Sequence, residues 1–427
     1  SSSLSYKVSV EIMFLNFYLY YKYTIWRLFM KRYLYLIVGT ISMCIYGLMY
    51  NWTVFSYPVQ QSIGITESAA ANVFSICQIF LTIGGLVSGF LYYKINYKFS
   101  MIITYIFLSL GLFITSKANN VITIYLSYSF GYTFCAGYAY KSLLTAIMSH
   151  FNDKSGIASG ILLMGAGLTA FVFNVPMSYL ISIYGWRNAM KCLALIAFII
   201  TMISAILIKP NDKETTLSIE TTNDSPEDIP TKKMIKLPSF WLYFVWSILL
   251  MAGCTAVMGN SVNCGIKLGI NPTTAALLST IISLANSLSR IVYGYIYDKK
   301  GRKITMQITT FLFSLSALSI LLSLYIKSVT LLCVSFILIG LTFGAIPTVS
   351  NIYILKQYGS KYYPSNFAIQ YLYSLISSIF GTMLFSKLFS LTSSYLYSYS
   401  FILIYAFISI ILLISLNQVL NSKHSNL

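Results

Sequence analysis

Two basic side chains lie within apolar stretches of this sequence, where a charge is costly and therefore informative. Arg290 lies eight residues before Asp298, the first acidic residue of the following polar segment, or roughly 12 Å along a helix. Lys141 follows Tyr138 and Tyr140 in another apolar stretch. A charge at the centre of a membrane-spanning helix costs on the order of 2.5–3.5 kcal/mol, so each cation requires a counter-charge or a water-filled cavity.

The sequence offers Arg290 no internal acidic partner, because all ten Asp and Glu residues fall in polar segments or near the N-terminus. The natural counter-charge is an anion from outside the protein, and the alternative is that Arg290 bonds backbone carbonyls or helix ends. Lys141 shares a helix face with Gly137, four residues earlier. It points to a central cavity if that small face does, and otherwise extends toward the membrane interface. Two such cations would favour carboxylates or phosphates inside the protein.

The elements that must hold these residues are apolar stretches long enough to cross a membrane. Of 427 residues, 57% are hydrophobic and 9% are charged, whereas soluble domains carry about 25% charged residues. A bilayer core requires roughly 20 apolar residues per helix. The pattern predicts an all-α integral membrane protein with about twelve transmembrane helices, at 33–57, 69–92, 99–116, 121–148, 156–183, 189–208, 239–265, 274–297, 304–326, 330–354, 365–387 and 396–418.

The basic residues predict how these helices are oriented. The net charge is +18, but Lys and Arg occur as short clusters between apolar stretches, which is typical of membrane topology and excludes a nucleic-acid-binding face. If the N-terminus is cytosolic, the inner loops hold most of these residues and the outer loops hold roughly one each. The sequence therefore predicts a multi-pass protein with both termini in the cytosol. It does not distinguish a plasma membrane from an organelle membrane.

The longest polar segment divides the predicted helices into two sets of six. Residues 209–238 contain four prolines and six acidic residues without apolar periodicity, which is typical of a linker. This cytosolic linker separates an N-terminal bundle, 33–208, from a C-terminal bundle, 239–418. Residues 419–427 form a C-terminal tail.

The N-terminal segment, residues 1–32, is aromatic and apolar but is interrupted by Asn16, Lys22 and Arg27. These interruptions favour an interfacial helix or a targeting segment over a thirteenth span.

Few residues could hold a metal or perform acid–base chemistry. All seven cysteines lie in apolar stretches, and none forms a CxxC pair. The two histidines, His150 and His424, lie in polar segments. Membrane hydrolases and acyltransferases need more acids and histidines within the membrane. We therefore expect no metal, no cofactor and no enzymatic activity.

The polar segment that begins at Gly294 carries the most specific motif. Its Gly294-x3-Asp298-x2-Gly301-Arg302 pattern resembles the loop signature of the major facilitator superfamily, whose fold joins two six-helix bundles. The resemblance implies that Asp298 and its basic neighbours bind helix ends across the two halves and latch one conformation. The alternative is a plain positively charged loop. The corresponding loop of the first half has Tyr93 in place of the acidic residue, which implies a degraded latch there.

Over most of its length the chain also resembles the family that contains the oxalate:formate antiporter and the monocarboxylate transporters. The resemblance rests on these segments, in order: Tyr50-Asn-Trp52 to Pro58, His150 to Gly160, Gly165-Ala-Gly167, Pro176, Tyr184-Gly-Trp186-Arg187 and Asn286-Ser-Leu-Ser-Arg290. It implies that Arg290 binds a substrate carboxylate. It also implies an aromatic lining that includes Tyr50, Tyr140 and Phe343, with Trp52 of the first motif beside them. Ordinary packing in a Tyr-rich protein is the alternative for these four aromatic residues.

Three departures from this family bear on the substrate and on coupling. The oxalate carrier has a second cation where this chain has Ser374, so a monocarboxylate fits better than oxalate. Animal proton-coupled carriers have an Asp where this chain has Asn286, which we count among the substrate-binding residues, and a Lys where it has Val59. Because no acid lies within the membrane, facilitated diffusion or exchange is as plausible as proton symport.

The sequence thus predicts a transporter of a small organic anion, a pyruvate-, lactate- or formate-like monocarboxylate, that works in the lipid bilayer by alternating access and as a monomer. The alternative is a carrier of the same fold for a neutral or cationic solute, such as a sugar, amino acid, nucleoside or drug. Such a cavity would use amide side chains, for which Asn174, Asn260 and Asn263 are candidates. A membrane enzyme or a non-transporting receptor is disfavoured by the scarcity of acids and histidines.

Overall fold

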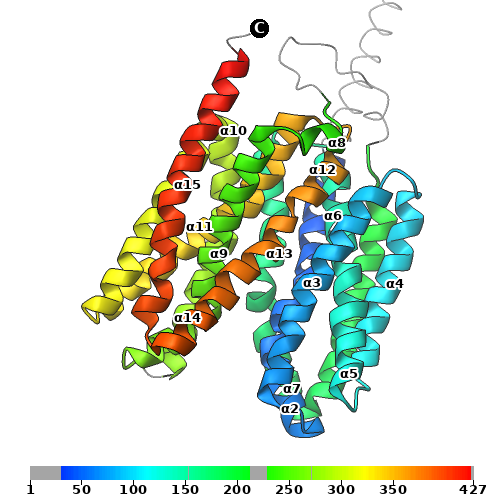
Figure 1. The fold of residues 1–427 in the computed structure, drawn as a ribbon. Helices are drawn as coiled ribbons and strands as arrows, with labels where there is room; N and C mark the ends of the chain where they lie inside the picture. Colours follow the sequence, from blue (N-terminus) through cyan, green and yellow to red (C-terminus); the bar gives the residue numbers. More distant parts are fainter. Residues whose placement is uncertain (1–29, 152, 212–227, 271, 425–427) are drawn as a thin grey trace, which may run out of the picture.

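A computed structural model describes residues 30–151, 153–211, 228–270 and 272–424, nearly all of them helical (Figure 1). No strand occurs within these ranges. The predicted N-terminal segment, 1–32, falls almost entirely outside the described residues, as does the centre of the predicted linker, 212–227.

The first half of the chain begins with a helix over residues 30–46. The further elements are η1 (Leu48–Asn51), α2 (Trp52–Ile63), α3 (Glu67–Leu91), α4 (Tyr97–Thr115), α5 (Val121–Ile124), the π-helix η2 (Tyr125–Tyr132), α6 (Thr133–Met148) and α7 (Ser155–Leu207). Helices α3, α4 and α5 each have an N-cap residue whose side chain accepts the backbone N–H of the residue three positions later. These N-cap residues are Thr66, Asn96 and Asn120.

The second half begins with a short helix in the linker and continues with long helices. The elements are α8 (Thr231–Met234), α9 (Pro238–Lys267), α10 (Pro272–Tyr325), α11 (Val329–Tyr358), α12 (Tyr363–Gln370), α13 (Leu372–Ser378), the π-helix η4 (Ile379–Met383), α14 (Leu384–Thr392) and α15 (Tyr395–His424). Together α12 to α14 form one apolar span over Tyr363–Thr392.

Nine helices of the described chain are long and apolar enough to cross a membrane. Two of them, α7 and α10, each contain two spans joined at a glycine with positive φ, 77° at Gly185 and 75° at Gly301. The chain doubles back at Gly185, so that the two ends of α7 lie close together. Nε2 of His150, before α7, lies 2.8 Å from the carbonyl oxygen of Lys209, after it. Counting α7 and α10 as pairs, and adding residues 121–148 interrupted by η2, gives the twelve predicted spans.

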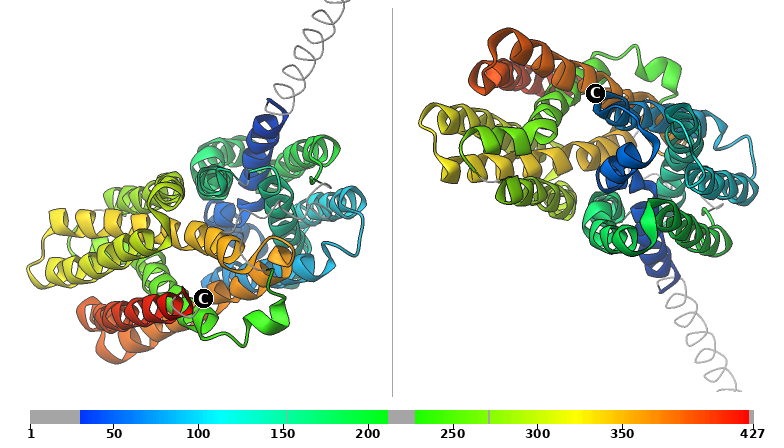
Figure 2. Two further views of the ribbon diagram at one scale, coloured as in Figure 1. Left: turned by 90° about the horizontal axis from the view of Figure 1, so that it is seen from above. Right: turned by 90° about the horizontal axis from the view of Figure 1, so that it is seen from below.

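The helices form two bundles that meet through a few close contacts (Figures 1 and 2). Helix α7 of the first half packs on α10 of the second, and α3 packs on α12. Both contacts depend on glycine: a Cβ atom on Gly294 would lie 2.1 Å from the carbonyl oxygen of Gly156, and one on Gly89 would lie 2.4 Å from Cβ of Ala368. The prediction of an all-α fold with two bundles is confirmed.

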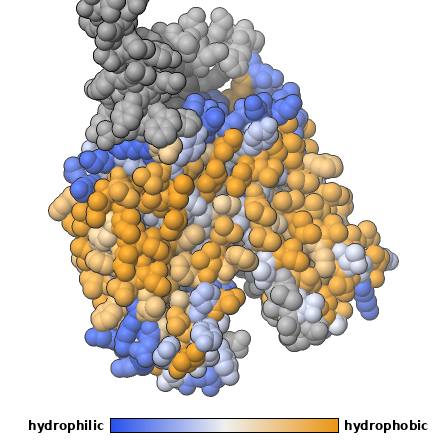
Figure 3. Space-filling view, turned by 180° about the vertical axis from the view of Figure 1, so that it is seen from behind, coloured by the Kyte–Doolittle hydropathy of each residue, from blue (hydrophilic) through white to orange (hydrophobic). Residues whose placement is uncertain are grey.

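We call the end of the molecule that carries the C-terminus and α8 the terminal side, and the other end the opposite side (Figure 1). The close glycine contacts between the bundles lie toward the terminal side. On the opposite side the surface is hollowed between two lobes (Figure 3). The bundles are therefore closed together at the terminal side and separated at the other. That the terminal side faces the cytosol stays a prediction.

Candidate binding site

A cavity of about 50 Å³ lies between the two bundles. From the first half it is lined by Tyr46, Gly47, Met49, Tyr50, Gln78, Leu81, Tyr140 and Ala166, and from the second by Met251, Arg290, Phe343, Pro347, Tyr371, Tyr373 and Ser374. Five of the residues singled out from the sequence thus share one cavity: Tyr50, Tyr140, Arg290, Phe343 and Ser374.

Irregular backbone surrounds this cavity. The first helix ends before Gly47, and the 3₁₀ turn η1 carries Met49 into the wall. A Cβ atom on Gly47 would lie 2.6 Å from the carbonyl oxygen of Ala166, so glycine permits the close approach to α7. Pro347 interrupts the bonding of α11, and Tyr371 lies at the junction of α12 and α13. Non-helical backbone at membrane depth is tolerated where it lines such a cavity.

Arg290, on α10 of the second bundle, forms a hydrogen bond with the first bundle. Its side chain is buried, with 7% of the residue exposed. Nη1 donates to the carbonyl oxygen of Leu163 on α7 at 2.5 Å, and Asn286 Oδ1, one turn earlier on α10, accepts from Nη2 at 3.3 Å and from Nε at 3.4 Å. The bond to the Leu163 carbonyl agrees with the alternative given above, that Arg290 bonds backbone carbonyls. Arg290 forms this bond and also lies in the cavity wall.

These bonds leave Arg290 with unused hydrogen-bonding capacity. A guanidinium carries five N–H donors, and the three bonds use one on each nitrogen, so one N–H on each Nη has no partner in the described protein. Neither of the two ion pairs within the described chain involves Arg290. A cation with two free donors in a cavity wall can bind a carboxylate through both oxygens.

Six of the other fourteen wall residues are aromatic. Tyr50 and Phe343 were expected from the sequence, and Tyr371 and Tyr373 were not. The rings of Tyr140 and Tyr371, from opposite bundles, lie 6.1 Å apart between centroids. Apolar walls with a few polar groups are typical of small-molecule sites.

The side chain of Lys141, on α6, lies among three aromatic rings. Only 4% of this residue is exposed. Its ammonium lies 3.4 Å from the ring centroid of Tyr371, 3.6 Å from that of Phe367 and 5.2 Å from that of Tyr140. Its Nζ has no hydrogen-bond partner in the described protein. Lys141 therefore neither lines the cavity nor reaches the membrane interface, but contacts two rings, Tyr140 and Tyr371, that do line the cavity.

The other predicted binding residues have local partners. Asn286 supports Arg290 as described. Trp52 lies away from the cavity, because its Nε1 donates to the carbonyl oxygen of Ala70 at 2.8 Å and its ring packs against Tyr128. Of the asparagines considered for a neutral solute, Asn174 and Asn260 are not in the cavity wall, and the side chain of Asn263 lies outside the described residues.

The motif at the end of the first span of α10 joins the two bundles. The carboxylate of Asp298 accepts the backbone N–H groups of Gly156 and Ile157, at the start of α7, at 3.0 Å each. Lys356 Nζ of α11 lies 3.4 Å from the same carboxylate. A carboxylate bound to a helix N-terminus is favoured by the free N–H groups and by the helix dipole.

The glycines and the arginine of this motif shape its two ends. Gly294 permits the backbone contact with Gly156, and Gly301 supplies the positive φ at the turn. Arg302 Nη1 donates to Asn417 Oδ1 of α15 at 2.9 Å, within the second bundle. Asp298 thus contacts the other bundle, whereas Arg302 does not.

Some wall residues carried a signal in the sequence and others did not. Gln78 is an amide within an apolar span, and a polar residue at that depth is a recognisable signal. Tyr371 and Tyr373 resemble many of the 36 tyrosines of the chain and could not be selected by type. No group of three or more potential metal ligands occurs among the residues that the structure describes.

Comparisons with known sequences agree with this architecture. A profile of the Major Facilitator Superfamily matches residues 36–264 and again residues 261–425. The chain is 23% identical to the oxalate:formate antiporter of Oxalobacter formigenes over 361 residues, which cover 82% of this chain and 83% of the antiporter. It is 21% identical to monocarboxylate transporter 2 of Mus musculus over 369 residues, which cover 81% and 75% of the two chains.

Solved structures are similar in fold at lower identity. FucP in the outward conformation matches with a TM-score of 0.67 and 12% identity, covering 91% of this chain and 99% of FucP. The proton:xylose symporter XylE, bound to 6-bromo-6-deoxy-D-glucose, matches with a TM-score of 0.68 and 15% identity, covering 90% and 94%.

Proposed function

Because this chain belongs to the Major Facilitator Superfamily, and is therefore a multi-pass membrane transporter rather than an enzyme, we propose that it carries a small organic anion across the membrane. We assign the substrate to the monocarboxylates, compounds such as pyruvate, lactate or formate. The similarity to the oxalate:formate antiporter and to monocarboxylate transporter 2 supports this substrate class.

The observation that carries the proposal is the environment of Arg290. This cation lies in the wall of a cavity between the bundles, at membrane depth, without an acidic partner among the described residues. A bound carboxylate would supply the missing negative charge and accept the two free N–H groups. In a dry cavity such a charge-assisted pair is much stronger than in water.

The size and lining of the cavity favour a small substrate. A cavity of about 50 Å³ is far below the 300–1,000 Å³ that is usual for drug-sized ligands. Arg290 is the one cation among the described residues that line it, and Ser374 is neutral. One carboxylate can therefore be neutralised directly at the wall, while the methyl or methylene groups of the substrate pack on Tyr50, Phe343 and Tyr373.

The way in which the bundles are joined supports alternating access. In this conformation Asp298 holds the start of α7 at the terminal side, while the opposite side is hollowed (Figure 3). Release of that contact and approach of the bundles on the opposite side would expose Arg290 to the terminal side. We propose that Asp298, Gly294 and Gly301 form this latch, with Arg302 holding the turn to α15.

Uptake into proteoliposomes tests the substrate class. Radiolabelled pyruvate, lactate, formate and oxalate would be compared with lactamide, the neutral amide that has nearly the shape of lactate. We expect uptake of at least one monocarboxylate, weaker uptake of oxalate, and no inhibition by lactamide. Inhibition by lactamide equal to that by lactate would contradict the anion assignment and favour a neutral solute.

A further inference from the structure

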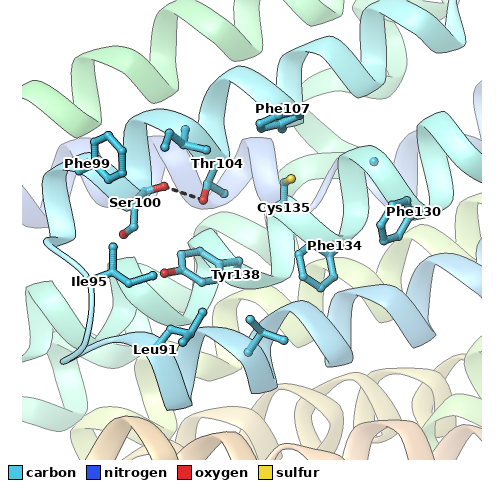
Figure 4. Close-up of a pocket in the computed structure, with 13 residues that line it drawn as sticks. Leu91, Ile95, Phe99, Ser100, Thr104, Phe107, Phe130, Phe134, Cys135 and Tyr138 are labelled. Carbon is cyan, nitrogen blue, oxygen red and sulfur yellow. Dashed lines mark hydrogen bonds between the residues drawn. The ribbon is translucent and has the colours of Figure 1, made fainter.

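A large groove on the membrane-facing surface of the first bundle is separate from the substrate cavity. It has a volume of about 460 Å³ and lies between α3 and α4, with η2 and α6 as its floor (Figure 4). Helices α3 and α4 each pack on α6 and η2, but the described residues of these two helices make almost no contact with each other. The groove is the space left between them.

The walls of this groove are apolar, and its few hydroxyl groups are largely satisfied. Phe99, Phe107 and Phe130 lie at its edge, with 61%, 58% and 46% of each residue exposed. Ser100 and Thr104 donate to backbone carbonyl oxygens of α4 at 3.0 and 2.7 Å. The groove therefore requires an apolar occupant, and its position on the membrane-facing surface makes lipid acyl chains the available one.

The terminal-side end of the groove is basic. Lys94 and Lys98 are exposed and directly adjoin Ile95 and Phe99, which line the groove. The helices that form the groove carry one acidic residue, Glu67, at the far end of α3 and 27 residues before Lys94, so neither lysine has a counter-charge from these helices at its end of the groove. A ligand with an apolar body and an anionic head matches this arrangement.

We propose that the groove binds one phospholipid with a net negative headgroup, with an acyl chain along α4 and the phosphate at Lys94 and Lys98. The distance supports this placement. Phe107 follows Lys98 by nine residues, which is roughly 14 Å of helix, and the middle of an acyl chain lies at that depth. The occupant would fill the space between α3 and α4 and so stabilise α4 against α6.

Quenching of a tryptophan reporter by brominated lipids tests the proposal without measuring transport. Phe107→Trp places the reporter in the groove. Phe311→Trp is the matched control, because Phe311 is 64% exposed and lies at a similar depth in a span of the second bundle that also begins at the terminal side. Each protein would be reconstituted in phosphatidylcholine containing a fixed fraction of phosphatidylglycerol or phosphatidylcholine with dibrominated acyl chains.

We expect the groove reporter to prefer phosphatidylglycerol by roughly fivefold to thirtyfold, as one or two basic residues near an anionic headgroup would produce, and the control reporter to show no preference. Lys94→Gln with Lys98→Gln should abolish the preference. Lys232→Gln with Lys233→Gln, an equal loss of exposed charge on α8, should not. An equal preference at both reporters, or a preference that survives loss of Lys94 and Lys98, would overturn the proposal.

Discussion

Among single residues, the two buried cations are held in different ways. Arg290 uses one N–H on each nitrogen for acceptors in the described protein, which leaves two N–H groups without an acceptor there. Lys141 has no hydrogen bond and is stabilised by the faces of aromatic rings. Cation–π contacts contribute about 2 kcal/mol or more when desolvated, which is less than full solvation of an ammonium. Burial of a protonated Lys141 beside the cavity therefore comes at a cost in stability.

Replacement of Lys141 by Met separates these two effects. We expect the melting temperature to rise, because a buried charge is replaced by an apolar side chain of similar length. We expect the KM for the anion to rise several-fold, because loss of a positive charge close to the cavity weakens the attraction for an anion in surroundings of low dielectric constant. The measurements are thermal unfolding and concentration-dependent uptake. An unchanged KM would assign Lys141 to packing alone.

His150 gives a pH dependence at the terminal side. Burial lowers the pKa of His150 below its usual 6.5, the bond to the Lys209 carbonyl raises it in part, and the charge of Lys31 lowers it further. The unfolded chain therefore binds the proton more readily than the folded chain. The contribution of His150 to the free energy of unfolding is fully present above pH 6.5 and is lost as the pH falls through the lowered pKa. Melting temperatures between pH 7.5 and 5.5 should fall more for the native protein than for His150→Gln. Parallel curves would contradict this.

Among the helices, the start of α7 is the element through which the bundles engage. Its first free N–H groups are satisfied by Asp298 of the other bundle rather than by a local cap, because Lys154 at the N-cap position provides no side-chain acceptor. The second corresponding contact, between α3 and α12, has no such carboxylate among the described residues. Asp228 of the linker instead accepts the N–H of Lys361 ahead of α12, at 3.1 Å. One of the two helix starts is therefore fixed across the bundles and the other within its own half.

Replacement of Asp298 by Asn should loosen the terminal-side closure. The change removes the charge from a helix N-terminus, a contribution of up to about 2 kcal/mol, so the population open at the terminal side should rise by roughly tenfold. Spin labels at Lys94→Cys and Lys361→Cys, one on each bundle, would report a longer distance. Asp153→Asn is the control, since Asp153 pairs with Arg32 at 3.0 Å within the first bundle. An unchanged distance distribution in the Asp298 variant would show that Asp298 is not a latch.

At the scale of the whole molecule, the sequence predicted the fold because lipid imposes a simple rule on helix length and charge. All twelve spans follow from apolar length, including the two pairs of spans that are joined at Gly185 and at Gly301. The rule does not predict where a helix breaks. The predicted span 33–57 in fact ends its first helix before Gly47 and continues to Ile63 through Pro58. That break is set by contact with α7, which no local pattern records.

The candidate site was predictable where a residue was chemically unusual for its depth. Arg290 could be identified because a charge within an apolar span that has no acidic partner is rare. The motif placed Trp52 beside the site, but in the structure its indole N–H donates to the carbonyl oxygen of Ala70 on α3. Tyr371 was missed because nothing in a Tyr-rich sequence distinguishes a ring in the cavity from one in the core. Side-chain direction depends on the packing of all helices.

The most direct test of the account is monocarboxylate uptake by proteoliposomes that contain Arg290→Gln, beside the native protein and Arg187→Gln. Arg187 also donates to backbone carbonyls, those of Ser116 and Ala118, but lies away from the cavity. Loss of one partner of a buried charge pair costs about 2–5 kcal/mol. We predict that Arg290→Gln lowers kcat/KM by about a hundredfold, while Arg187→Gln transports nearly normally. Normal uptake by a folded, inserted Arg290→Gln protein would contradict the assignment of Arg290 as the anion-binding residue.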